Sequence, residues 1–144
     1  RSQQSVQKRD MRPVPKLRVL CVDDEPTILD AMTRLLEGWG CIVEREDTYE
    51  GAVKTLRSGV FDVLLADLEL TGEETGIDLI VECRDALSNP VQCALITAKA
   101  TPEIEALAGA LRVSVFRKPV EPENIRSFLV TCTPETIDGT QAAE

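Results

Sequence analysis

Acidic side chains in this sequence stand directly after apolar runs, and a threonine and a lysine occupy similar positions. Asp23, Asp24 and Glu25 follow residues 17–22, Asp67 follows 61–66, Thr97 follows 91–96, and Lys118 comes shortly after 113–116. Clustered carboxylates repel one another, and a hard divalent cation such as Mg²⁺ compensates them without histidine or cysteine ligands. A carboxylate can also attack a phosphoryl group, while a lysine and a hydroxyl bind the transferring oxygens. If these side chains meet, the expected chemistry is Mg²⁺-assisted formation of an aspartyl-phosphate.

These residues can meet only if the apolar runs are strands of one sheet. The runs predict parallel strands at 17–22, 41–43, 61–66, 91–96 and 113–116. Helical patterns follow them, beginning at Pro26, at Asp47 or Thr48, after the polar loop 67–75, at Thr101-Pro102 and at Pro122. Five such units are too few for an eight-stranded barrel. We therefore expect an α/β fold with a doubly wound, five-stranded parallel sheet, (βα)5 and flavodoxin-like, in strand order 2-1-3-4-5. The candidate residues then share the edge that carries the ligand crevice.

The length of 144 residues predicts a single domain. We expect residues 1–16 to form a flexible basic N-terminal linker, residues 17–131 the domain, and residues 132–144 a disordered tail. The chain starts at Arg1 rather than Met, as a fragment of a longer protein would. It shows no secretory signal and no apolar run long enough to span a membrane, and its five cysteines form no C-x-x-C pair. These features predict a cytoplasmic location with reduced thiols.

Charge and composition exclude several functions. The net charge is −9, and six basic residues within 1–18 leave the remainder strongly acidic. We therefore expect no nucleic acid partner and no membrane contact by this chain itself. The absence of histidine rules out Ser-His-Asp and Cys-His catalysis, the usual zinc sites and a phosphohistidine on this chain. No glycine-rich phosphate loop is present, so the phosphoryl donor is expected to be another protein domain or a small phosphodonor.

Four motifs in order resemble those of response-regulator receiver domains of two-component signalling, over about residues 17–130: Val22-Asp23-Asp24-Glu25-Pro26, Leu64-Leu65-Ala66-Asp67-Leu68-Glu69-Leu70, Ile96-Thr97-Ala98 and Phe116-Arg117-Lys118-Pro119-Val120. The resemblance implies that Asp67 is the phosphoacceptor and that Thr97 and Lys118 bind the phosphoryl group. It also implies Mg²⁺ as cofactor, held by Asp67, by Asp24 directly, by Asp23 through water and by the backbone carbonyl of Glu69. It further implies a cis peptide between Lys118 and Pro119.

The same resemblance implies a histidine kinase or a histidine phosphotransfer domain as partner. Receivers of this kind phosphorylate and dephosphorylate themselves with Mg²⁺, so whether to count the chain as an enzyme stays open. Residues 35–40 and the loop 72–76 are similar to the C-terminal receivers of bacterial hybrid sensor histidine kinases. From the short segment after the last helix, we expect no DNA-binding output domain. The expected place is then the cytoplasm, or the cytoplasmic end of a membrane-anchored kinase.

Three alternatives stand beside this interpretation. The chain can be a stand-alone single-domain response regulator, or a non-phosphorylated pseudo-receiver that works as a binding module. A phosphohydrolase of the haloacid dehalogenase type also uses an aspartate nucleophile on an α/β sheet. That type is disfavoured because residues 23–27 lack its D-x-D-x-T spacing and no cap domain fits.

The sequence departs from the receiver pattern at three places. Thr71 stands where proline is usual, and the loop after it is one residue longer, which predicts a more mobile loop. Val115 occupies the position of an aromatic switch side chain, and Phe116 beside it should point to the opposite face of its strand. Lys99 and Glu69, each two residues beyond a site residue, are placed to form an ion pair.

Overall fold

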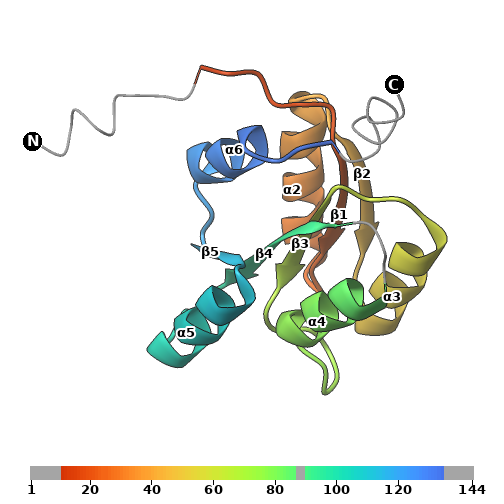
Figure 1. The fold of residues 1–144 in the computed structure, drawn as a ribbon, viewed down its shortest axis with the longest axis vertical. Coiled ribbons are helices and arrows are strands. Elements are labelled where there is room, and N and C mark those ends of the chain that lie inside the picture. Colours follow the sequence, from red (N-terminus) through yellow and green to blue (C-terminus); the bar gives the residue numbers. More distant parts are fainter. Residues whose placement is uncertain (1–10, 87–89, 135–144) are drawn as a thin grey trace, which may run out of the picture.

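A computed structural model describes residues 11–86 and 90–134. Strands and helices alternate along the chain (Figure 1). Their bounds are β1 Arg18–Val22, α2 Pro26–Gly38, β2 Ile42–Glu46, α3 Tyr49–Ser58, β3 Val63–Asp67, α4 Gly76–Ala86, β4 Gln92–Thr97, α5 Pro102–Leu111, β5 Ser114–Arg117 and α6 Pro122–Val130.

The five strands form one parallel sheet in the order β2-β1-β3-β4-β5, which confirms the predicted fold. β1 and β3 lie side by side at the centre, with Val22 opposite Ala66. β3 pairs with β4 so that Asp67 lies opposite Ile96. The last residues of these strands, and the loops after them, therefore meet at one edge of the sheet.

Helices cover both faces of the sheet (Figure 1). One core is built by α3, α4 and α5 with one face, through buried residues such as Leu56, Ile80 and Ala108. The other is built by α2 and α6 with the opposite face, through Leu36 and Leu129 among others. Burial of the central strands on both faces explains why they read as apolar runs.

Several local signals place the helix ends as expected. Pro26, Pro102 and Pro122 each occupy a first helical position, where proline's missing N–H leaves no bond unmade. The Thr48 hydroxyl caps α3 by accepting from the Gly51 N–H at 3.0 Å, and Thr101 caps α5 in the same way. The strand β2 runs three residues beyond the predicted 41–43, to Glu46, because pairing with β1 extends it through polar residues.

The packed part of the domain begins before β1. Val14, inside the segment expected as a linker, packs against the core that α2 and α6 build with the sheet. The carbonyl oxygen of Arg12 accepts a hydrogen bond from Arg126 Nη2 on α6 at 2.6 Å. Residues 1–10 of the expected linker, residues 87–89 and residues 135–144 of the expected tail lie outside the described residues. Among the residues described, no helix is both long and apolar enough to cross a bilayer.

Candidate functional site

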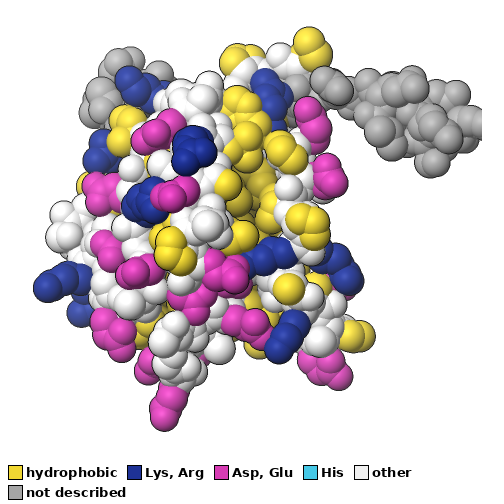
Figure 2. Space-filling view, turned by 180° about the vertical axis from the view of Figure 1, so that it is seen from behind, with side chains coloured by type: hydrophobic (Ala, Val, Ile, Leu, Met, Phe, Trp, Pro, Cys, Tyr) yellow, Lys and Arg dark blue, Asp and Glu magenta, His cyan; other side chains and the backbone are white. Residues whose placement is uncertain are grey.

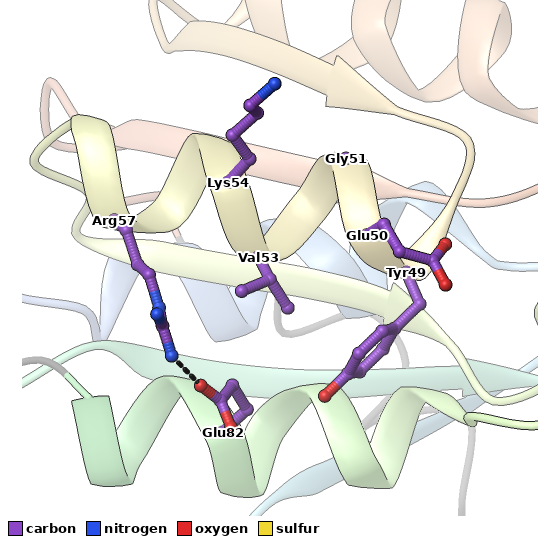
Figure 3. Close-up of a pocket in the computed structure, with 7 residues that line it drawn as sticks. All are labelled: Tyr49, Glu50, Gly51, Val53, Lys54, Arg57 and Glu82. Atoms are coloured by element: carbon purple, nitrogen blue, oxygen red, sulfur yellow. Dashed lines mark hydrogen bonds and ion pairs between the residues drawn. The ribbon is translucent and has the colours of Figure 1, made fainter.

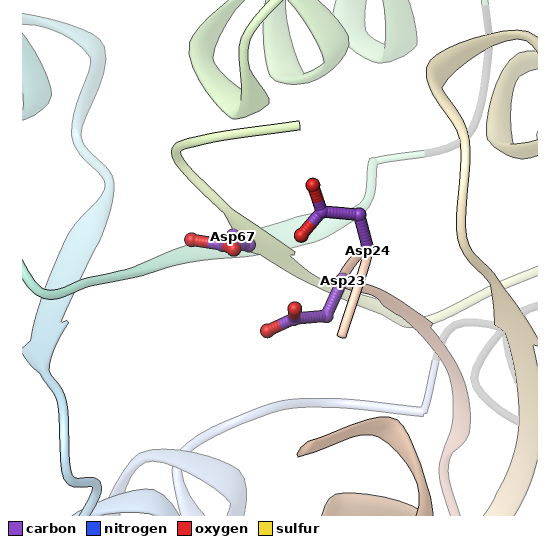
Figure 4. Close-up of side chains that lie close together, drawn as sticks. All are labelled: Asp23, Asp24 and Asp67. Atoms are coloured by element: carbon purple, nitrogen blue, oxygen red, sulfur yellow. The ribbon is translucent and has the colours of Figure 1, made fainter. Parts of the chain in front are cut away.

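Three carboxylates gather at the carboxyl edge of the sheet (Figure 4). Asp67 is the last residue of β3, while Asp23 and Asp24 directly follow β1. One oxygen of each side chain lies within 4.8 Å of one oxygen of each of the others. Asp23 and Asp67 are each only 5% exposed, so most water is excluded from their charges. The acids predicted from the sequence as phosphoacceptor and metal ligands are thus brought together.

Lys118 compensates this buried negative charge. Its Nζ lies 3.1 Å from Asp23 Oδ2 and 3.2 Å from Asp67 Oδ2, and it also reaches Glu25 Oε1 at 3.6 Å. Lys118 directly follows β5, an edge strand of the sheet. Its backbone N–H donates to the carbonyl oxygen of Thr97 at 2.9 Å, which joins it to the end of β4. The Lys118–Pro119 peptide bond is cis, as the resemblance implied.

The compensation is incomplete at Asp67. Burial and the neighbouring Asp23 charge raise the pKa of Asp67 to about 6, although Lys118 and the Glu69 N–H act to lower it. Burial acts to lower the pKa of Lys118, but its bonds to Asp23 and Asp67 outweigh that effect and raise it above the usual value. Asp67 is therefore mostly ionised at neutral pH, and it binds a proton, or another electrophile, more strongly than an ordinary aspartate does.

Thr97 lies at the end of β4 and is fully buried. Its Oγ1 accepts a hydrogen bond from the Lys99 N–H at 2.9 Å, which leaves its own proton available to a ligand. Lys99 Nζ in turn pairs with Glu69 Oε2 at 3.1 Å, so the predicted ion pair across the rim of the site is confirmed.

The donor set at this edge fits a hard divalent cation. It consists of carboxylate oxygens from Asp23, Asp24 and Asp67, with a backbone carbonyl at Glu69 close in sequence. Mg²⁺ and Ca²⁺ prefer oxygen ligands, and such an ion would offset the repulsion that Lys118 leaves uncompensated. No histidine or thiol is needed.

Three residues contribute to the site without having been assigned a role from the sequence. The Glu25 N–H donates to Asp23 Oδ1 at 2.9 Å and orients that carboxylate. The Thr71 hydroxyl donates to Asp24 Oδ2 at 2.9 Å. Gly76 begins α4 against the backbone of Asp67: a Cβ there would lie 2.3 Å from the Asp67 carbonyl oxygen. A glycine at the start of a helical pattern could have indicated the close approach at Gly76, but the contacts of Glu25 and Thr71 have no such sequence signal.

The departures at β5 also have structural consequences. Val115 packs against the core that contains α5, whereas Phe116 faces the other core. The Phe116 ring meets Phe128 of α6 edge to face, with centroids 5.7 Å apart. The predicted opposite orientation of these two neighbours is therefore confirmed.

Two hollows on the surface differ in their relation to the site. An apolar groove of about 310 Å³ lies between α2 and the β5–α6 connection, and Lys118 forms part of its wall. Figure 2 shows hydrophobic side chains gathered in a strip on that face, with acidic and basic side chains at its lower end. A hollow of about 620 Å³ lies instead between α3 and α4, spanned by the Arg57–Glu82 ion pair (Figure 3). It contains none of the acids of the site, so we do not associate it with their chemistry.

This α/β sheet order is that of flavodoxin-like doubly wound proteins, and its acids and bridging lysine lie in the crevice where such proteins bind their ligands. Comparison with known families agrees, because the model of the response regulator receiver domain matches residues 19–129. The chain belongs to this family, the phosphoacceptor domains of two-component signalling. Receiver domains work with histidine kinases or phosphotransfer proteins and generally bind Mg²⁺ in an acidic pocket.

Two curated proteins are similar to this chain over part of their length. The chain is 32% identical over 114 residues to the transcriptional regulatory protein ZraR of Escherichia coli K12, and 33% identical over 113 residues to the alginate biosynthesis transcriptional regulatory protein AlgB of Pseudomonas aeruginosa. These matches cover 77% and 76% of this chain but only 25% and 24% of the relatives, so the chain spans about a quarter of their length.

Two solved structures show the similarity of fold. A CheY-like receiver domain protein from Methanospirillum hungatei superposes with a TM-score of 0.73 at 23% identity, covering 90% of this chain and 99% of its own. A response regulator from Burkholderia pseudomallei, solved with a phosphorylated aspartic acid, calcium ion and citrate, superposes with a TM-score of 0.71 at 22% identity. It covers 88% of this chain and 71% of its own.

Proposed function

We propose that this domain accepts a phosphoryl group on Asp67 from the phosphohistidine of a histidine kinase or histidine phosphotransfer domain. The observation that carries the proposal is the placement of Lys118 Nζ between Asp23 and Asp67, beside a buried Thr97. This arrangement holds a nucleophilic carboxylate and two phosphoryl-binding groups in one small space. The solved relative from Burkholderia, with its phosphorylated aspartic acid and calcium ion, supports the same use of the site.

In the transfer, an Asp67 carboxylate oxygen forms a bond to phosphorus while the phosphorus–nitrogen bond of the donor histidine breaks. The raised pKa of Asp67, about 6, leaves it mostly ionised at neutral pH and makes it a stronger nucleophile than an ordinary carboxylate. Lys118 is placed to turn from Asp67 to a phosphoryl oxygen, and the free proton of Thr97 to donate to another. Hydrolysis of the acyl phosphate by water returns the domain to its starting state.

Asp23, Asp24, Asp67 and the Glu69 carbonyl are the groups that would hold Mg²⁺. When bound, the ion supplies positive charge that neutralises the transferring phosphoryl oxygens.

The partner must bring a histidine close to Asp67, and the apolar groove beside Lys118 offers a surface for it. Its wall combines Ile28, Met32 and Leu35 of α2 with Pro119 and Val120 after the site lysine. A partner that covered these side chains would bury apolar area and exclude water from the reacting groups at the same time. We propose this groove as the docking surface of the phosphodonor domain.

The phosphoacceptor role is tested by incubation with acetyl phosphate and Mg²⁺, followed by borohydride trapping and mapping of the modified residue. We expect modification of Asp67 in the wild type and none in Asp67→Asn. Asp30→Asn, which removes an exposed carboxylate paired with Arg45, is the matched control and should react like the wild type. Modification of Asp67→Asn to the wild-type extent would refute the assignment, and an unreactive wild type would favour the pseudo-receiver.

We propose the C-terminal receiver of a hybrid histidine kinase as the context of the domain, on the similarity of residues 35–40 and 72–76 to that group. The names of the curated relatives support a second candidate, a receiver joined to a transcriptional output unit. A stand-alone regulator is the third. Sequencing the gene on both sides of the region that encodes residues 1–144 distinguishes them: a kinase core upstream supports the first, an output domain downstream the second, and neither the third.

A further inference from the structure

Thr71 belongs to the loop between β3 and α4, outside the five side chains that the proposed chemistry uses. Its hydroxyl donates a hydrogen bond of 2.9 Å to Asp24 Oδ2, although the two residues lie 47 positions apart in the chain. The contact joins this loop to the β1–α2 loop through Asp24, one of the three clustered acids. It exists only because this chain has a hydroxyl-bearing residue at position 71.

The loop around Thr71 is held at several points, so the hydroxyl has a defined position. Leu70, the preceding residue, is buried in the core that α3, α4 and α5 build with the sheet. Gly72, the following residue, adopts a φ of +104°, which glycine accepts without steric strain and which turns the chain sharply. Glu69 and Thr75 pair in an antiparallel bridge across the loop. These contacts oppose the mobility that the sequence predicted for this segment.

Asp24 is the carboxylate of the cluster that most needs an external restraint. It is only partly buried, whereas Asp23 and Asp67 are held by Lys118. Repulsion from those two acids favours rotation of the Asp24 side chain outward into solvent. The hydrogen bond from Thr71 opposes this rotation, and it leaves Oδ1 and a second lone pair of Oδ2 free to bind a cation.

We infer that Thr71 is a positioning residue of the metal site, which holds Asp24 in the orientation that a divalent cation requires. The inference rests on the proposed function, because it takes Asp23, Asp24 and Asp67 as the metal ligands. Hydrogen-bond partners of metal ligands typically contribute about 10–100-fold to metal affinity. Thr71 is exposed to solvent, so the lower end of that range, about tenfold, is expected here.

The test is titration of the protein with MgCl₂ alone in a calorimeter, without any phosphodonor. Thr71→Val keeps the shape of the side chain but removes the hydroxyl, and should raise the Kd for Mg²⁺ about tenfold. Thr71→Ser keeps the hydroxyl and should restore an affinity close to that of the wild type. Thr131→Val is the matched control, because it removes an exposed threonine hydroxyl at the end of α6 that donates to the Phe128 carbonyl oxygen, on an element away from the acids.

A Kd of Thr71→Val equal to or below that of the wild type would overturn the inference. So would a loss of affinity that Thr71→Ser fails to restore, since the hydroxyl would then not be the cause. Melting temperatures in EDTA show that each variant is folded before titration, and Thr71→Ala gives a second hydroxyl deletion with a smaller side chain. Absence of Mg²⁺ binding by the wild type would refute the metal site of the proposed function itself, which separates that failure from a failure of the role of Thr71.

Discussion

At the scale of single residues, the site is a balance between three carboxylates and one ammonium group. Lys118 satisfies one oxygen of Asp23 and one of Asp67, while the Glu25 and Glu69 N–H groups bond the others. The remaining repulsion appears in the raised pKa of Asp67. The burial and repulsion that raise the pKa of Asp67 also make the metal-free site destabilising to the fold, and both the reactivity proposed for Asp67 and this loss of stability can be measured.

The first prediction concerns Asp67 and pH. Its pKa in the folded protein, about 6, lies above the ordinary value of 3.8, so burial of its charge opposes folding at neutral pH. In EDTA at pH 7.5, Asp67→Asn should raise the free energy of unfolding by about 1 kcal/mol, after allowance for solvent screening. The gain should shrink as the pH falls through 6 and vanish near 4, because wild-type Asp67 is then protonated in the folded state. Urea unfolding at several pH values measures this difference, and a gain independent of pH would contradict the prediction.

The second prediction concerns Lys118. Lys118→Ala leaves Asp23 and Asp67 without their shared cation in a nearly dry site, and should lower the free energy of unfolding in EDTA at pH 7.5 by about 2 kcal/mol. The loss stays below that of a fully buried ion pair because Asp67 can take up a proton instead. Lys54→Ala, which removes an exposed lysine of α3, should change the stability by less than about 0.5 kcal/mol. Equal effects of the two substitutions in urea unfolding would show that Lys118 does not compensate the acids.

At the scale of elements, the site depends on how closely the helix after β3 approaches Asp67. α4 begins at Gly76, whose N–H donates to the Leu68 carbonyl oxygen at 2.9 Å. This bond folds the β3–α4 loop back onto the end of β3, and only a residue without a Cβ leaves room for the Asp67 carbonyl group there. The start of α4 and the position of Asp67 are therefore coupled.

The third prediction tests this coupling. Gly76→Ala places a methyl group 2.3 Å from the Asp67 carbonyl oxygen, so the backbone must shift, and the free energy of unfolding should fall by about 2 kcal/mol. Phosphorylation by acetyl phosphate should slow as Asp67 moves. Gly109→Ala is the control, because its Cβ would meet nothing within 4 Å on α5, and it should stabilise the protein by about 0.5 kcal/mol. Thermal or urea unfolding that shows Gly76→Ala as stable as Gly109→Ala would contradict the proposed close approach.

At the scale of the whole molecule, the sheet separates two cores, and a conformational change that starts at the site can spread through one core or the other. Val115 lies on the side of α5, and the adjacent aromatic ring, Phe116, packs on the other side against α6. Valine is small and its χ1 angle is stiff, so it is poorly suited to fill a space opened by movement of Thr97. Phosphorylation should therefore change the surface around α5 little, as suits a domain that passes on or stores a phosphoryl group.

The fourth prediction is measured by NMR. Beryllofluoride with Mg²⁺, a mimic of the phosphoryl group, should shift the amide signals of residues near Asp67, Thr97 and Lys118, with small shifts along α5. Sedimentation should show no added self-association. Val115→Tyr, which supplies a ring at the same position, should extend the shifts along α5. Large shifts throughout α5 of the wild type, accompanied by dimerisation, would overturn the prediction.

The sequence alone determined the strands and helices with few errors, and it placed the candidate site residues at one edge, because the central strands are buried on both faces. Their apolar runs end in polar residues, and parallel strands bring those ends to one edge in a known order. Asp23, Asp67, Thr97 and Lys118 could therefore be placed together without coordinates. β2 was predicted too short because residues 44–46 are charged, and only their pairing with β1 makes them strand.

Tertiary structure alone decided the contacts that join distant loops or depend on distances of a few ångströms. No local pattern predicts that the Thr71 hydroxyl reaches Asp24, that Val14 packs against the core that α2 and α6 build, or how close Gly76 lies to the Asp67 carbonyl oxygen. Hydrophobic periodicity reports which face of an element is buried, but it does not report which polar group another loop places opposite it. The proposed phosphoacceptor and metal ligands could thus be located from the chain, while the hydrogen bonds and close contacts that restrain these side chains required the folded molecule.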